Sequence, residues 1–224
     1  YSHMIHEDVG RDTDLTIVCM DKNYFRIVSS SATREHDKYH ILKYLDKDVE
    51  FSDVTEEFCC LGLFGPKSRE MISKICKDDF SNENFKFGTG KFINIFDANT
   101  PWGKPKEIKI WAQRLSYVGE VGFELYVDSS SAKDLYEILI EEGKNFELSH
   151  CGMHAMDIMR MESGFVHWGH DISPEENQYQ AGLKFAISYK KNVNFIGKDA
   201  LLKIKDQKLD KRMMMFTLKD SKPG

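Results

Sequence analysis

Two side chains in the stretch RLSYVGEVGFELYV, residues 114–127, could do chemistry together: the phenol of Tyr117 and the carboxylate of Glu124. Residues 114–117 and 123–127 alternate polar and apolar side chains, and residues 119–122 have turn chemistry, which predicts a β-hairpin. In such a hairpin Tyr117 and Glu124 would face each other across the two strands. They could bind a ligand with several N–H groups, or they could be an ordinary cross-strand pair. The local pattern favours the ordinary pair.

Asp14 is a second candidate, because a carboxylate at the mouth of an apolar strand can reach into a cavity. It follows the flexible residues 8–11 and opens the apolar run of residues 15–20. The alternative is a solvated turn acid, which the local sequence alone favours.

Other motifs give no site. GTGKFI, residues 88–93, lacks the third glycine of a dinucleotide loop and precedes a strand where a helix is needed. LGLFGPKSRE lacks the GK[ST] ending of a phosphate loop. The five cysteines have no CxxC spacing, and we expect buried, reduced thiols. The histidines, including His150, His154, His167 and His170, form no HExxH pair, so no metal is expected.

The elements that must position these residues follow from periodicity and turn signals. In the first part of the chain we expect strands at 15–20 and 24–28, a serine cap at 29–31, a helix at 34–45, a strand at 58–64 and a helix starting at Pro66. Further strands at 91–96 and 108–117 flank a loop rich in glycine, proline and asparagine. Helices are expected at 131–143 and 154–163. Last come a strand at 182–189, a short helix at 198–205, a strand at 213–218 and a linker-like segment at 220–224.

The fold class is therefore α+β, with antiparallel sheets and helices. Between about residues 55 and 165 the order of elements suits a split βαβ, ferredoxin-like sandwich.

Composition excludes several kinds of partner. The chain has 224 residues, of which 41% are hydrophobic, enough to bury the core of one large domain or two small ones. Its 31 basic and 36 acidic residues are well mixed and offer no basic field to nucleic acid. Neither a membrane span nor a secretory signal is visible. We expect a globular protein of the cytoplasm or an organelle matrix, with no nucleic-acid or membrane partner.

Five longer runs carry a resemblance to one family. They are YSHMIHEDVGRDTDLTIV, CLGLFGPKSREMI, LSYVGEVGFELYV, GMHAMDIMRMESGFVHWGHDISPEENQYQAGLKFAI and NFIGKDALL. In order and with consistent spacing, they resemble the glycine-cleavage aminomethyltransferase (T-protein) family. The closest similarity is to the folate-binding region of dimethylglycine and sarcosine dehydrogenases.

The resemblance implies a cloverleaf of three domains around a folate channel. Residues 1–54 would end a Greek-key-like first domain, and residues 55–165 would form a ferredoxin-like second domain. Residues 166–224 would return to the first domain and lead towards a C-terminal barrel. The chain would then be a fragment, without that barrel and without the FAD domain of the dehydrogenases.

The resemblance also assigns roles to five residues. Asp14 matches the aspartate beside N5 and N10 of tetrahydrofolate, where it acts as general base or positions the amine. Glu124 matches the glutamate that bonds the pterin ring, and Tyr117 the tyrosine of the same segment. Tyr1 matches an aromatic residue of the folate site, and Ser30 stands where the T-protein has an asparagine.

One departure from the T-protein pattern points to the dehydrogenase branch of the family. Met156 precedes Asp157 where the T-protein has an arginine, and the dehydrogenases also lack that arginine. On the same helix, Arg160 and Glu162 are expected to form structural ion pairs.

The implied function is tetrahydrofolate-dependent one-carbon transfer, in the folate-binding region of an FAD-dependent dimethylglycine or sarcosine dehydrogenase-like enzyme. Tetrahydrofolate is the expected cofactor, a small N-methylated amine the substrate, and FAD is expected only in another part or subunit of the parent protein. The alternatives are a stand-alone folate-dependent aminomethyl- or S-methyltransferase without FAD, and a non-catalytic folate-binding module. The expected location is the cytoplasm, or the mitochondrial matrix if the source is eukaryotic.

Overall fold

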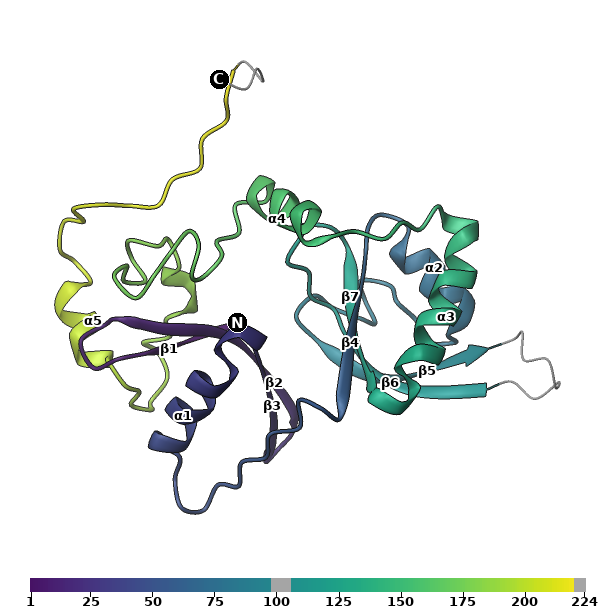
Figure 1. The fold of residues 1–224 in the computed structure, drawn as a ribbon. Coiled ribbons are helices and arrows are strands. Elements are labelled where there is room, and N and C mark those ends of the chain that lie inside the picture. Colours follow the sequence, from purple (N-terminus) through teal and green to yellow (C-terminus); the bar gives the residue numbers. More distant parts are fainter. Residues whose placement is uncertain (98–105, 220–224) are drawn as a thin grey trace. The chain divides into compact units, whose positions relative to one another are not determined.

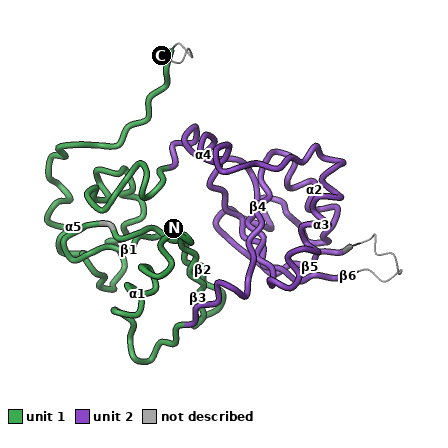
Figure 2. Tube along the Cα trace, in the orientation of Figure 1, with its two compact units in different colours: residues 1–51, 166–224 green, residues 52–165 purple. Residues whose placement is uncertain are grey.

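The chain divides into two compact units, each built around its own sheet (Figures 1 and 2). A computed structural model describes residues 1–97 and 106–219. Unit 1 consists of Tyr1–Phe51 and Val166–Gly224, and unit 2 of Ser52–Phe165. The chain thus leaves unit 1, forms unit 2 and returns to unit 1.

Unit 1 holds an antiparallel sheet of three strands in the order β1-β2-β3. Its elements are β1 (Ser2–Ile5), β2 (Arg11–Asp21), β3 (Tyr24–Ser29), α1 (Arg34–Tyr44) and α5 (Lys198–Ile204). A short 3₁₀ turn, Ser31–Thr33, leads into α1, and the Oγ of Ser30 caps it by accepting from the Ala32 N–H at 3.3 Å. A small core joins both segments of the unit, because Ile5 packs with Tyr179 and Leu201.

Unit 2 holds an antiparallel sheet of four strands in the order β4-β7-β6-β5. Its elements are β4 (Phe58–Phe64), α2 (Ser68–Ile75), β5 (Gly90–Asp97), β6 (Lys106–Gln113), β7 (Gly122–Asp128), α3 (Ala132–Gly143) and α4 (Met153–Glu162). The expected α+β class with antiparallel sheets is confirmed. In one respect the sheet differs from a split βαβ unit: all neighbouring strands are antiparallel, so β4 and β5 run in opposite directions.

Alternation along β7 decides which side chains enter the core of unit 2. Phe123, Leu125 and Val127 are buried on the face that α2 and α3 cover (Figure 1). Each such apolar side chain contributes about 1.5 to 3 kcal/mol when it leaves water. Because successive side chains of a strand point to opposite faces, Glu124 and Tyr126 lie on the face away from these helices.

Two expected strands are absent from the described chain. Within residues 182–189 the structure has a 3₁₀ turn, Lys184–Ala186, which follows Gly182 at φ +75°. Leu183 is buried there without a ladder, in a small cluster with Ile172. Residues 213–218 have no regular structure, and their one recorded backbone bond runs from the Met213 N–H to the Gln180 carbonyl. The apolar residues of these two segments are typical of a buried or extended backbone, but they do not provide a partner strand.

Boundaries also differ from expectation. Asp14 lies inside β2 rather than at its start, and α2 begins at Ser68 rather than Pro66. Cys76 is buried, but Cys19, Cys60 and Cys151 are exposed, so the expected burial of the thiols is wrong for most of them, although all five are free. The expected loop and linker at residues 98–105 and 220–224 lie outside the described residues.

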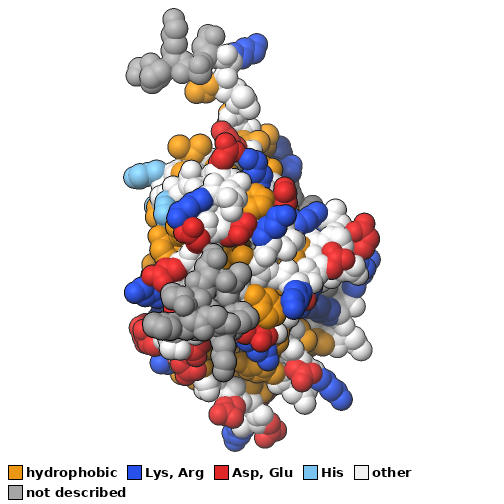
Figure 3. All heavy atoms as spheres, turned by 90° about the vertical axis from the view of Figure 1, so that its right-hand side faces the viewer, with side chains coloured by type: hydrophobic (Ala, Val, Ile, Leu, Met, Phe, Trp, Pro, Cys, Tyr) orange, Lys and Arg blue, Asp and Glu red, His pale blue; other side chains and the backbone are white. Residues whose placement is uncertain are grey.

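Charges of both signs are interspersed on the face that Figure 3 shows. In the described part of the chain, no helix combines the length and the hydropathy that a bilayer crossing requires.

Candidate functional site

Tyr1 and Asp14 meet on the sheet of unit 1. The Tyr1 hydroxyl donates to Oδ2 of Asp14 at 2.7 Å, and Asp14 is half-buried opposite His3 on β1. The Tyr1 ring is stacked on Phe185, with 6.1 Å between centroids. No described lysine or arginine forms a recorded ion pair with Asp14. The carboxylate therefore has one fixed donor, and its Oδ1 is available to accept a proton.

Ser30 lies just beyond the end of β3, the strand next to the one that carries Asp14. Leu15 pairs with Ser29 in the β2–β3 register, so Ser30 follows at the level of Asp14. Its hydroxyl oxygen accepts the Ala32 N–H, so Ser30 caps the 3₁₀ turn that leads into α1. Three of the five candidate residues thus lie in unit 1.

Glu124 is held on the open face of the sheet in unit 2. The Tyr126 hydroxyl donates to Oε2 of Glu124 at 2.7 Å, and Glu124 is half-buried. Burial, with the neighbouring Cys60 thiol and Glu124 carboxylate, raises the pKa of Tyr126 above its ordinary value. Tyr126 therefore remains a donor at every physiological pH, and this fixes one carboxylate oxygen.

The expected Tyr117–Glu124 pair across a hairpin is wrong. Strand β6 ends at Gln113, and the cross-strand neighbour of Glu124 is Gln113 on one side and Gly62 on the other. Directly after the strand the Leu115 N–H donates to the Gln113 carbonyl at 3.0 Å, and this tight turn takes the chain away from β7. Tyr117 stacks on Phe165 instead, with 6.2 Å between ring centroids.

Arg160 of α4 is a structural residue, as expected. It is 3% exposed, and its Nε donates to Oδ1 of Asp157 at 2.7 Å while Nη1 donates to the Phe165 carbonyl at 3.0 Å. The exposed Glu162 has no recorded ion pair among the described residues, so the expected pairing of that residue is not seen.

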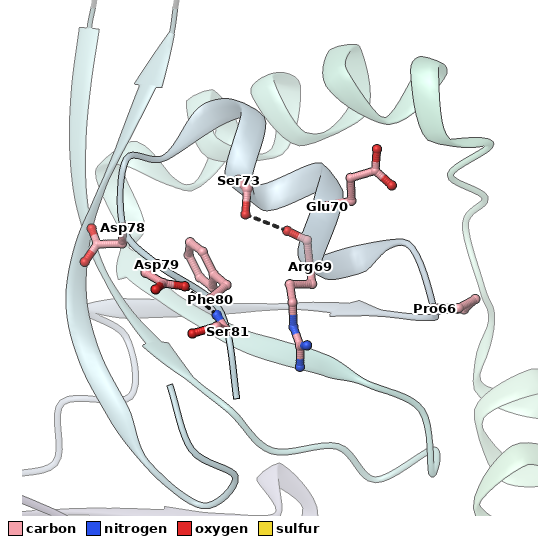
Figure 4. Close-up of a pocket in the computed structure, with 8 residues that line it drawn as sticks. All are labelled: Pro66, Arg69, Glu70, Ser73, Asp78, Asp79, Phe80 and Ser81. Atoms are coloured by element: carbon pink, nitrogen blue, oxygen red, sulfur yellow. Dashed lines mark hydrogen bonds between the residues drawn. The ribbon is translucent and has the colours of Figure 1, made fainter. Parts of the chain in front are cut away.

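A hollow of about 600 Å³ in unit 2 lies beside α2 (Figure 4). Its lining residues are Pro66, Arg69, Glu70, Ser73, Asp78, Asp79, Phe80 and Ser81. The carboxylates outnumber the single guanidinium, and α2 covers the face of the sheet opposite Glu124. We therefore assign the hollow no part in the site.

A cluster of histidines around Asp12 was not expected from the sequence. Asp12 is 6% exposed, and Nε2 of His6 and Nε2 of His36 each lie 3.0 Å from its Oδ1, while His40 pairs with its Oδ2. The other nitrogen of His36 lies 3.1 Å from Oδ1 of Asp37. Among residues 1–97 and 106–219, no group of three such side chains has a geometry that could hold a metal ion.

Fold and geometry together define a class: an α+β protein with a tyrosine-bound carboxylate on each of two antiparallel sheets. Residues 1–191 match the model of the GCVT N-terminal domain, so the chain belongs to that family. The solved structure of the glycine cleavage system aminomethyltransferase T from Bartonella henselae has the same fold. It aligns with a TM-score of 0.73 and 23% identity, over 92% of this chain and 52% of that one.

Two relatives are longer proteins. The chain is 34% identical to 4-methylaminobutanoate oxidase (formaldehyde-forming) of Paenarthrobacter nicotinovorans, over 100% of this chain and 26% of the relative. It is 31% identical to mitochondrial dimethylglycine dehydrogenase of Mus musculus, over 97% of this chain and 24% of the relative. The chain thus spans about a quarter of the length of these two proteins.

Sequence reasoning missed Gln113 and Tyr126 as neighbours of Glu124. Tyr126 lies two residues along the same strand, so alternation in FELYV was a signal for it. Gln113 carried no such signal, because its position depends on where β6 ends.

Proposed function

We propose that the chain is the tetrahydrofolate-binding region of an enzyme that oxidises an N-methylated amine at FAD and transfers the one-carbon unit to folate. The observation that carries the proposal is the match of residues 1–191 to the GCVT N-terminal domain, with Asp14 and Glu124 both present. The two relatives, an oxidase and a dehydrogenase of methylated amines by name, support the FAD-linked context.

Tetrahydrofolate supplies two nitrogens, N5 and N10, that can share one carbon at the oxidation level of formaldehyde. In the proposed reaction that carbon forms a bond to each nitrogen, and the demethylated amine, or water if the carbon arrives as formaldehyde, leaves. The product is 5,10-methylenetetrahydrofolate. Asp14 accepts the proton that the second nitrogen loses, at the Oδ1 that Tyr1 leaves open.

Glu124 holds the pterin ring. Its carboxylate can accept from two neighbouring N–H groups of the pterin edge, and such charge-assisted hydrogen bonds contribute about 1.5 to 3 kcal/mol each. Tyr126 keeps one of its oxygens in place. The contribution to rate is then mainly orientation of the folate nitrogens. Tyr1, Tyr117 and Ser30 are proposed as further contacts of the folate.

The cell compartment belongs to the same proposal. The mitochondrial name of the mouse relative is consistent with a matrix location in a eukaryote, and we propose the cytoplasm otherwise.

The test uses the full-length protein and the substitution Asp14→Asn, which keeps size and hydrogen-bond acceptance. We expect tetrahydrofolate binding by calorimetry to change less than threefold, while the rate of 5,10-methylenetetrahydrofolate formation falls at least 100-fold, within the range of a general base. Asp21→Asn, at the exposed far end of the same strand, is the matched control and should change neither quantity.

Full transfer by the Asp14→Asn variant would contradict the assigned role. Transfer that requires no FAD would favour the stand-alone transferase. Binding of folate without transfer by the wild type would favour a non-catalytic folate module.

A further inference from the structure

Four residues lie side by side across the sheet of unit 2, one on each strand. In the order of the strands they are Gly62, Glu124, Gln113 and Gly90. All four are on the face away from α2 and α3, because their neighbours along the strands pack into the core of the unit. We call this set the Glu124–Gln113 row. Its two central side chains are polar, and its two outer positions carry none.

The Gln113 amide is buried and its orientation is fixed. Gln113 is 3% exposed, and its Oε1 accepts the indole N–H of Trp111 at 3.3 Å. An indole nitrogen only donates, so the oxygen of the amide must face Trp111 and the NH₂ group must point elsewhere. Among the described residues, no recorded hydrogen bond joins this Nε2 to another side chain or to the backbone, and the atom is not one of the fully buried nitrogens. The NH₂ group can therefore donate to a ligand on this face of the sheet.

Aromatic rings border the row at both ends. A Cβ on Gly62 would lie 2.5 Å from the Phe64 ring, and a Cβ on Gly90 would lie 2.4 Å from the Trp111 ring. Both rings therefore occupy the space that a side chain at the glycine positions would fill. Such a border suits the flat faces of an aromatic or partly aromatic heterocycle.

The polar pair presents an acceptor beside a donor. Cross-strand neighbours have Cβ atoms about 5 Å apart, so the Glu124 carboxylate and the Gln113 NH₂ can contact one edge of one ring. A carboxylate matches adjacent N–H groups, and an amide NH₂ matches a carbonyl oxygen next to them. The edge of a pterin has this order: a 2-amino group, an N3–H and a 4-oxo oxygen.

We propose that Gln113 is a specificity-determining residue, whose Nε2 donates to the 4-oxo oxygen of the pterin that Glu124 binds. The inference rests on the proposed function, since it takes the ligand of Glu124 to be a reduced folate. Its consequence is discrimination against a 4-amino pteridine, because an exocyclic amino group would place a second donor against the Gln113 NH₂. A site built to bond one polar group rejects the wrong one strongly, since its own buried group is then left unpaired.

The test compares tetrahydrofolate with 4-amino-4-deoxy-tetrahydrofolate, by calorimetric titration of the full-length protein. Glu124 also favours the 4-oxo ring, through N3–H, so the informative quantity is the change in the affinity ratio on mutation. In Gln113→Met, which keeps the length of the side chain, we expect the preference for the 4-oxo ligand to fall at least tenfold, about 1.4 kcal/mol. Asn94→Met, a polar-to-apolar change on β5 outside the row, is the control and should leave the ratio unchanged.

A purely structural Gln113 would give a different result. Its loss would weaken both ligands equally and leave the ratio as in the wild type, and that outcome would overturn the inference. Trp111→Phe is a second variant in case Gln113→Met does not fold: it keeps an aromatic ring but removes the N–H that holds the amide oxygen, and the ratio should fall.

The experiment distinguishes failure of the proposed folate site from failure of the role proposed for Gln113. If the wild type binds tetrahydrofolate and Glu124→Gln weakens that binding, while Gln113→Met leaves the ratio unchanged, the pterin site stands and the role of Gln113 falls. If the wild type binds neither ligand, both proposals fall.

Discussion

At the scale of single residues, the site combines positions that the sequence predicts with positions that only the register can supply. The roles of Asp14 and Glu124 came from the family resemblance, and the structure places a tyrosine hydroxyl on each carboxylate. The partner expected for Glu124 was Tyr117, but the structure gives Tyr126 and Gln113. A pairing prediction fails when a strand ends four residues early, because every cross-strand neighbour then changes.

Tyr126→Phe tests the hydroxyl that holds Glu124. The change removes one hydrogen bond to a carboxylate and little volume, so the free energy of unfolding should fall by about 1 to 2 kcal/mol. Tetrahydrofolate affinity of the full-length protein should fall about three- to tenfold, because Glu124 loses its fixed orientation. Urea denaturation and calorimetry measure the two effects.

Tyr136→Phe is the matched control for that experiment. The Tyr136 hydroxyl also makes a side-chain hydrogen bond, to His150 at 2.8 Å, but Tyr136 is 43% exposed and lies on α3. We expect less than about 0.5 kcal/mol and no change in folate affinity. If the two variants behave alike, Tyr126 does not position Glu124.

At the scale of elements, periodicity predicted the strands and helices that have strong local patterns. The strand at 58–64 and the helices at 34–45, 131–143, 154–163 and 198–205 appear within one or two residues of their expected bounds. The strands at 182–189 and 213–218 do not form, since a strand needs a neighbour for its ladder and the local sequence does not name one. The contact between α1 and β2 could also not be predicted, because it depends on histidine and aspartate side chains that lie far apart in the sequence.

His36 links α1 to β2, and it makes the stability of unit 1 depend on pH. Its two ring nitrogens face two carboxylates, Asp12 on β2 and Asp37 on α1, so both can donate only when the ring is protonated. The hydrogen bond to Asp37 raises the pKa of His36, and Asp12 raises it further against the effect of burial. A raised pKa means that the stabilisation is fully present below the unfolded value, about 6.5, and is lost as pH rises through the higher folded value.

The expected result is a free energy of unfolding that falls as pH rises from below about 6.5 to beyond the folded pKa of His36. His36→Gln should remove that part of the slope, and the difference between wild type and variant isolates it from the nearby His6 and His40. His150→Gln is the control, since His150 bonds a tyrosine hydroxyl rather than a carboxylate. A wild-type slope that His36→Gln leaves unchanged would show that the bridge does not form in solution.

At the scale of the whole molecule, the two units differ in how the chain builds them. The core of unit 2 draws all its buried residues from one continuous stretch, between Leu63 and Leu139. The small core of unit 1 joins Ile5 with Tyr179 and Leu201, which lie on either side of that stretch in the sequence. Folding information for unit 2 is therefore local to residues 52–165, whereas unit 1 needs both of its segments.

A chain of residues 52–165 should consequently fold alone. We expect one cooperative urea transition by circular dichroism, because the unit has a complete sheet with helices on one face and a core of its own. Leu135→Ala, at a fully buried position of α3, should lower the free energy of unfolding by about 2 to 5 kcal/mol. An exposed position of the same helix, Tyr136→Ala, supplies the control with a much smaller effect.

Residues 1–51 are the complementary test. Without the segment that carries Tyr179 and Leu201, Ile5 has no partners among the core residues of unit 1, so this shorter chain should show no cooperative transition. If residues 52–165 fail to fold while the full-length protein folds, the core of unit 2 requires contacts beyond the cluster described here. If they fold, the Glu124–Gln113 row can be titrated apart from Asp14, and any folate affinity that survives measures the share that unit 2 contributes.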